Sequence, residues 1–125
     1  MIRLTLEFTD NLGPEADMAA LLRKLDGRLR RAAIGEAHVL AAARLLTDYV
    51  ASIADGGWAT VILTLRAPAS LEGVLKPCAQ DLFDLAEAHL TEIYLRHSIV
   101  LSLQLDLTAG EPLERRHARS ADVSF

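Results

Sequence analysis

The chain has few of the residues that build disulfide scaffolds, metal centres and aromatic cores. Among its 125 residues there is one cysteine, Cys78, which excludes an internal disulfide and a cysteine-based metal site. Aromatic residues make up 5% of the chain and hydrophobic residues 51%, so the core should be aliphatic. Cys78 lies among apolar helical positions, and we expect it to be a buried, inert thiol.

The sequence also lacks the features that direct proteins to membranes or nucleic acids. No apolar run approaches the roughly 20 residues of a membrane span, and no charged-then-apolar leader is present. A net charge of −4 argues against nucleic acid as a general partner. These features predict a cytoplasmic protein without a membrane or nucleic-acid partner. The length predicts a single domain over residues 1–125.

Motifs for cofactor or metal chemistry are missing as well. No histidine pair has the spacing of a metal site, and there is no phosphate-binding loop, dinucleotide fingerprint or nucleophile elbow. We therefore expect no cofactor and no metal. His89 falls on an apolar helical stripe, which favours a hydrogen-bonded packing role.

The first eleven residues predict a strand that begins at the very start of the chain. Apolar and polar residues alternate, with Ile2, Leu4, Leu6 and Phe8 on one face. A strand that starts there buries the α-amino nitrogen of Met1 or places it in a cavity. Because the pKa of such an amine lies near 8, it is a potential acid–base catalyst.

Further periodicities predict the remaining elements. A helix is expected over 14–33, a strand over 38–51 that forms a hairpin with 58–66 through the turn 54–57, and a second helix capped by Ser70. Its apolar stripe is expected to include Val74, Cys78, Leu82, Leu85, Ala86, His89 and Ile93, and Pro77 should kink its first turns. The clearest strand is 99–107. The echo between 4–7 and 63–66 indicates that one β-α-β unit occurs twice.

Two expectations concern assembly. Two helices on one face of the sheet would leave the other face bare and apolar, and trimerisation with the sheets facing inward would cover it. The polar tail 107–125 carries Arg115, Arg116 and Arg119. We expect these cations to meet an acidic neighbouring subunit rather than nucleic acid.

The run Glu7-Phe8-Thr9-Asp10-Asn11-Leu12, followed by Glu15-Ala16-Asp17, resembles the opening of the 5-carboxymethyl-2-hydroxymuconate isomerases of the tautomerase superfamily. The resemblance continues more weakly over 54–56, 70–72, 82–85 and 101–103. It implies an α/β (α+β) fold with a duplicated β-α-β unit, a four-stranded mixed sheet, two helices on one face and a homotrimer. It also implies an isomerase of aromatic compound degradation, which moves a proton in an unsaturated oxo or hydroxy acid with an amino-terminal proline as base.

The chain departs from that family at the positions that carry its chemistry. Ile2, Ala42 and Ala69 are expected to line the pocket where the family has its proline and two arginines. Because Ile2 is bulky, Met1 should be retained, which leaves its amine or a water molecule as base. Arg44 is the remaining candidate for carboxylate binding, and an ion pair on a strand is equally compatible with it.

Two hypotheses follow from these departures. The first is a weak or altered isomerase, and the second is a non-catalytic trimer that binds a small anion or serves as a structural module. Arg3 and Arg66 fall on polar strand faces, where solvation is the expected role.

Overall fold

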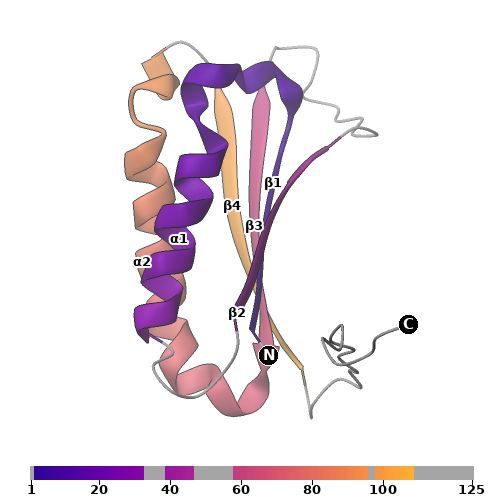
Figure 1. The fold of residues 1–125 in the computed structure, drawn as a ribbon, viewed down its shortest axis with the longest axis vertical. Helices are drawn as coiled ribbons and strands as arrows, with labels where there is room; N and C mark the ends of the chain where they lie inside the picture. The colour runs from indigo at the N-terminus through magenta and orange to yellow at the C-terminus, as the bar shows by residue number, and fades with distance from the viewer. Residues whose placement is uncertain (1, 33–38, 47–57, 96–97, 109–125) are drawn as a thin grey trace, which may run out of the picture.

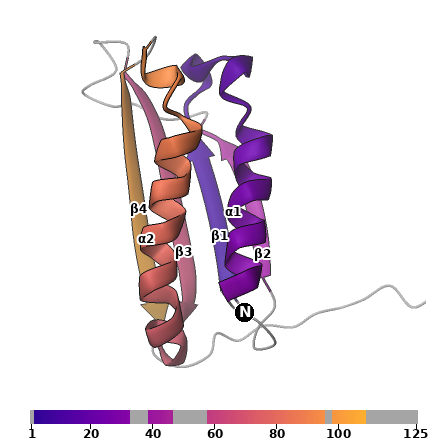
Figure 2. The same ribbon diagram turned by 90° about the vertical axis from the view of Figure 1, so that its left-hand side faces the viewer.

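The computed structural model describes residues 2–32, 39–46, 58–95 and 98–108. A sheet of four strands is covered on one face by two α helices, as Figure 1 and Figure 2 show. The main elements are β1 (Ile2–Phe8), α1 (Met18–Ala32), β2 (Val39–Leu45), β3 (Ala59–Pro68), α2 (Glu72–His89) and β4 (Ile99–Thr108). Short 3-10 turns are η1 (Asp10–Leu12), η2 (Pro14–Ala16), η4 (Ala69–Leu71) and η5 (Ile93–Leu95).

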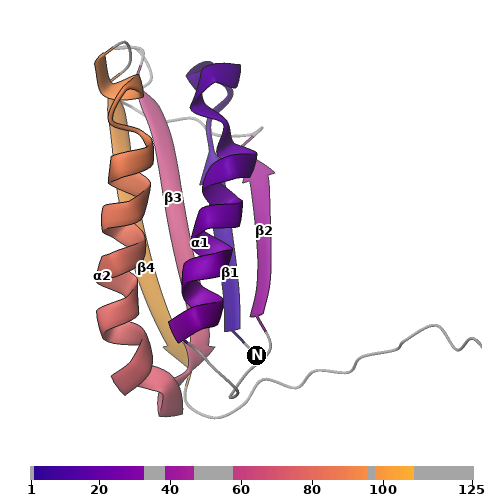
Figure 3. The same ribbon diagram turned by 60° about the vertical axis from the view of Figure 1, so that its left-hand side comes forward.

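The strand order β2-β1-β3-β4 shows that the chain contains the β-α-β unit twice (Figure 3). β1 and β2 are parallel and are joined through α1, while β3 and β4 are parallel and are joined through α2. The two units meet where β1 pairs with β3 in antiparallel orientation. The predicted duplication and the mixed sheet are therefore confirmed.

The predicted hairpin between 38–51 and 58–66 is wrong. β1 lies between β2 and β3, so these two strands do not pair. The crossover through α1 places β2 parallel to β1 on one edge, and β3 takes the other edge of β1. Turn residues 54–57, which suggested the hairpin, and the end of the predicted strand at 47–51 lie outside the described residues.

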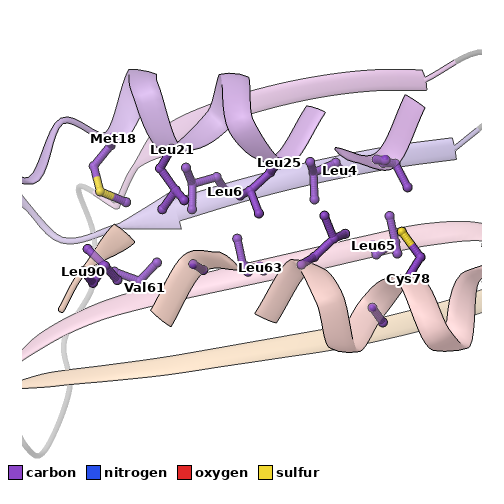
Figure 4. Packing of buried hydrophobic residues seen from close by; sticks show 14 of the residues in the cluster. Leu4, Leu6, Met18, Leu21, Leu25, Val61, Leu63, Leu65, Cys78 and Leu90 are labelled. Carbon is purple, nitrogen blue, oxygen red and sulfur yellow. The ribbon is translucent and has the colours of Figure 1, made fainter. Parts of the chain in front are cut away.

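The alternation in the first strand produces the core. Ile2, Leu4 and Leu6 are fully buried beneath the helices, whereas Arg3 faces the opposite side of the sheet. Figure 4 shows leucines of both central strands meeting side chains of α1 and α2. The aliphatic core is confirmed, as is the stripe on α1, where Met18, Leu21, Leu25 and Leu29 are buried and Leu22 is partly buried.

The helix starts differ from the predicted ones. α1 begins at Met18 because the Asp17 side chain caps it, accepting a hydrogen bond of 3.1 Å from the Ala20 N–H. Ser70 does not cap α2, since it belongs to η4 and the N-cap is Leu71, without a side-chain hydrogen bond. Val74 is 45% exposed, and the adjacent Leu75 takes its expected place in the core.

Two side chains of α2 behave as the sequence predicts. Cys78 is buried, and desolvation, with a smaller contribution from the Asp81 carboxylate, raises the pKa of its thiol. His89 is a packing residue whose Nε2 lies 2.8 Å from the Ala16 carbonyl and whose Nδ1 lies 2.9 Å from Lys24 Nζ. α2 continues through Pro77. No helix in the described ranges combines the length and the apolarity that a membrane crossing needs.

The sheet face away from the helices is polar, which corrects the expectation of a bare apolar face. On β1 it presents Arg3, Thr5 and Glu7, and on the other strands it presents Leu40, Ala42, Arg44, Thr60, Ile62, Thr64, Arg66, Val100, Ser102, Gln104 and Asp106. We call this surface the open face. On β1 and β3, charged and hydroxyl side chains alternate with buried leucines, so the open face tolerates water without a partner.

Candidate functional site

The residues expected from the sequence at the family's catalytic positions lie on different sides of the sheet. The Ile2 side chain is 0% exposed and belongs to the core beneath the helices. Ala42 is exposed on the open face, where it pairs with Thr5, and Ala69 is exposed in η4 beyond the end of β3. Met1 lies outside the described residues. In the described chain these three side chains supply neither a proton-transfer group nor a cation.

Arg44 lies on β2 and points onto the open face. Its Nη2 donates to Glu7 Oε2 at 2.6 Å, and the two residues are direct partners in the β1–β2 register. The Arg44 side chain is 69% exposed and the Glu7 side chain 17% exposed. The ion pair anticipated from the sequence is therefore present, and it fixes one end of the guanidinium while the rest faces solvent.

A hollow of about 220 Å³ lies in the open face beside this ion pair. Its lining comes from three neighbouring strands and consists of Arg3, Thr5, Glu7, Arg44, Thr64 and Arg66. Arginine and threonine do not exchange protons at neutral pH, and Glu7, the only carboxylate of the lining, is engaged by Arg44. The chemistry that this lining favours is recognition of an anion.

The hollow lies where the two β-α-β units meet. Thr5 and Thr64 are direct partners across β1 and β3, and they are also equivalent positions in the repeated sequence. On either side of them lies an ion pair between an inner and an outer strand. One pair is Glu7–Arg44, and the other is Arg66–Asp106, in which Arg66 Nε donates to Asp106 Oδ2 at 3.0 Å. The repeat thus places the same kind of contact twice, with the charges exchanged.

Sequence reasoning missed the part of Arg3 and Arg66 in this hollow. The sequence pattern places both on polar strand faces, and both are more than one-third exposed. The alternation of β1 and β3 shows which face each side chain occupies but not which residues lie opposite one another. Only the register reveals that Arg3 and Arg66 are direct partners.

The comparisons with known proteins agree with this architecture. The family model described as 5-carboxymethyl-2-hydroxymuconate isomerase matches residues 3–118. A crystal structure of a 5-carboxymethyl-2-hydroxymuconate isomerase from Deinococcus radiodurans R1 is 30% identical and superposes with a TM-score of 0.76. That match covers 92% of this chain and 90% of the other. The chain belongs to the 5-carboxymethyl-2-hydroxymuconate isomerase family.

More distant structures show the same fold. A 5-carboxymethyl-2-hydroxymuconate delta-isomerase has 21% identity and a TM-score of 0.75, with 94% of this chain and 89% of that chain covered. A structure described as a fused 4-OT wild-type symmetric trimer has 17% identity and a TM-score of 0.53, with 95% of each chain covered. No match was found among curated proteins. Membership of the isomerase family thus rests on the family model and the first of these structures, while the fold is that of the tautomerases.

Proposed function

We propose that this member of the 5-carboxymethyl-2-hydroxymuconate isomerase family moves a proton in an unsaturated oxo or hydroxy acid, weakly or with altered specificity. The observation that carries the proposal is the content of three positions: Ile2, Ala42 and Ala69 bear no acid, base or cation. Burial of Ile2 removes its side chain from any contact with substrate. Enolisation needs a base and cations that stabilise the developing enolate, and these positions supply neither.

Other groups must then supply the base and the cation. In this proposal the Met1 amine or a water molecule is the base, and Arg44 contacts a carboxylate of the ligand. Arg44 is exposed and has donors beyond the one that it gives to Glu7, since a guanidinium carries five N–H groups. A carboxylate-bearing ligand would therefore meet a cation that is already oriented.

A second candidate function is favoured by the hollow itself. Its lining is rich in cations, and within the described residues it has no histidine or amine to transfer a proton. A trimer that binds a small anion without converting it would keep these residues and dispense with the family's base. Catalysis and binding are separable by experiment.

The isomerase proposal predicts a low turnover. Conversion of 5-carboxymethyl-2-hydroxymuconate, followed by ultraviolet absorbance, should be about 10²–10⁴-fold slower than in a proline-bearing family member, because a positioned general base is missing. Arg44→Gln should weaken substrate binding further, while Arg23→Gln, the same change on the exposed surface of α1, should leave the rate unchanged. Full activity would show that another residue serves as the base.

We also propose a homotrimer in which the tail 107–125 contacts a neighbouring subunit. Both edge strands support an assembly: Leu40 and Leu45 on β2 are 52% and 43% exposed, and leucines of β4 are only partly buried. Edge strands with exposed apolar side chains tend to pair with another chain. The likeness to a structure described as a symmetric trimer agrees with this state.

Sedimentation velocity tests the trimer. The unmodified protein should have three times the mass of the 13.6 kDa chain. Leu40→Lys should shift the population toward monomer, because it places a charge on the β2 edge. Leu95→Lys is the matched control, since Leu95 is 86% exposed and belongs to η5 rather than to an edge strand. A monomer at micromolar concentration would refute the assembly.

A further inference from the structure

We propose that the open face holds a binding site for a phosphate-sized dianion, between Arg3 and Arg66 and above the hydroxyls of Thr5 and Thr64. The site deepens the anion-binding alternative proposed above and rests on the same hollow. It lies beside Ala42, the strand partner of Thr5, and it does not depend on whether the chain isomerises an oxo acid. It takes either a free phosphate or the phosphate group of an ester.

The first support is the position of two arginines. Arg3 on β1 and Arg66 on β3 are direct partners in the antiparallel register, with their side chains on the same face. Two guanidinium groups on one face of the sheet can therefore approach the same ligand. A dianion between them makes an attractive contact with each.

The second support is the orientation of Arg66. Asp106 on β4 accepts a hydrogen bond of 3.0 Å from Arg66 Nε, which uses one of the five N–H groups of the guanidinium. Planar guanidinium groups bind phosphate oxygens through paired N–H donors. Asp106 therefore holds Arg66 through Nε, and the N–H groups at the Nη end of the guanidinium can bind a ligand.

The third support is the floor of the hollow. Thr5 and Thr64 are partly buried and lie two residues along their strands from Arg3 and Arg66 respectively. Two residues of a strand span about 6–7 Å, so the hydroxyls and the guanidinium groups approach one ligand from different sides. A tetrahedral oxyanion has acceptors for donors in both places.

The charge of the lining fits the same ligand. Three arginines and Glu7 give a net charge of +2, which the nearby Asp106 lowers to +1. A phosphate ester carries about −1.5 to −2 at neutral pH. Arg44, at the other end of the hollow, attracts the anion over a longer distance, and its ion pair with Glu7 weakens this attraction.

Isothermal titration calorimetry with inorganic phosphate and with glycerol 3-phosphate tests the proposal. The protein is kept in a zwitterionic buffer at constant ionic strength, and succinate serves as a dicarboxylate comparator. We expect saturable binding with one site per chain, and weaker binding of succinate. Tighter binding of the ester would favour a phosphate ester as the ligand, and tighter binding of inorganic phosphate would favour free phosphate. Equal affinities would show that the site recognises the phosphate group alone. All three results support the site.

Variants locate the binding. Arg3→Gln and Arg66→Gln should each weaken phosphate binding about ten-fold or more, as expected for losing charge-assisted hydrogen bonds. Arg23→Gln is the matched control, because it removes the same charge from α1 and should leave the affinity unchanged. Thr64→Val changes no charge and should weaken binding several-fold, so it serves as the test if an arginine variant fails to fold by circular dichroism.

Three results would overturn the proposal. They are the absence of saturable phosphate binding at millimolar concentrations, an equal loss of affinity in Arg23→Gln, and tighter binding of succinate than of either phosphate. The proposed isomerase activity is measured separately by absorbance. Failure of the phosphate site therefore leaves that activity standing, and loss of the activity leaves the phosphate site standing.

Discussion

A variant carrying Ile2→Pro, Ala42→Arg and Ala69→Arg should isomerise a muconate-type substrate about a hundred-fold faster than the unmodified chain, or more, because it gains a general base and two cations. A small second residue also permits removal of Met1, which mass spectrometry verifies. Base and cations act on one transition state, so the triple variant should exceed the product of the separate gains. Ile2→Pro alone should have a modest effect.

The structure indicates which of these changes is difficult. Ala42 and Ala69 are exposed and accept arginine without repacking, but Ile2 is fully buried, and proline leaves part of its space unfilled. Ala43→Arg in place of Ala42→Arg is the matched control, since Ala43 is exposed on the same strand but pairs with Leu6 rather than Thr5. If the triple variant folds and loses Met1 yet stays inactive, anion binding without catalysis becomes the better account of this protein.

The largest stability effect should come from the centre of the sheet. Leu63→Ala should lower the free energy of unfolding by about 2–5 kcal/mol, because the side chain is fully buried between the sheet and the helices. Urea unfolding followed by circular dichroism measures the loss. Ser102→Ala, at an exposed position of the neighbouring strand, should change stability by less than about 0.5 kcal/mol. Comparable losses in the two variants would contradict this assignment of the core.

Elements with a strong period were predictable from the sequence. β1 and β4 alternate strictly, and the leucines of α1 recur at helical spacing, so their positions are close to the expected ones. The pairing of strands was not predictable, because the turn-like residues 54–57 suggest a hairpin whereas the crossover through α1 decides which strand lies beside which. The starts of the helices were not predictable either. Asp17 and Ser70 are equally good N-caps by residue type, but only Asp17 accepts a hydrogen bond from a backbone N–H of its helix.

The site was predictable only in part. Arg44 stood out as a cation near a position where the family has arginine, and its pairing with Glu7 follows from two oppositely charged strands that become neighbours. The polar character of the open face was contained in the alternation of β1 and β3, but the expectation of an apolar face overlooked it. The facing pair Arg3 and Arg66 depends on register, which hydrophobic patterning leaves open when both faces tolerate a shift of two residues.

The two ion pairs of the open face, Glu7–Arg44 and Arg66–Asp106, make the two ends of this surface chemically different. The two β-α-β units have identical residues at three successive positions of the paired strands β1 and β3, where Leu4, Thr5 and Leu6 correspond to Leu63, Thr64 and Leu65. At the next position the charges are opposite, because Glu7 on β1 pairs with Arg44 on β2, whereas Arg66 on β3 pairs with Asp106 on β4. A molecule that lies across β1 and β3 therefore meets two chemically different ends. A ligand with two different ends should therefore bind to the open face in one preferred orientation, even though the two β-α-β units beneath it have nearly the same backbone.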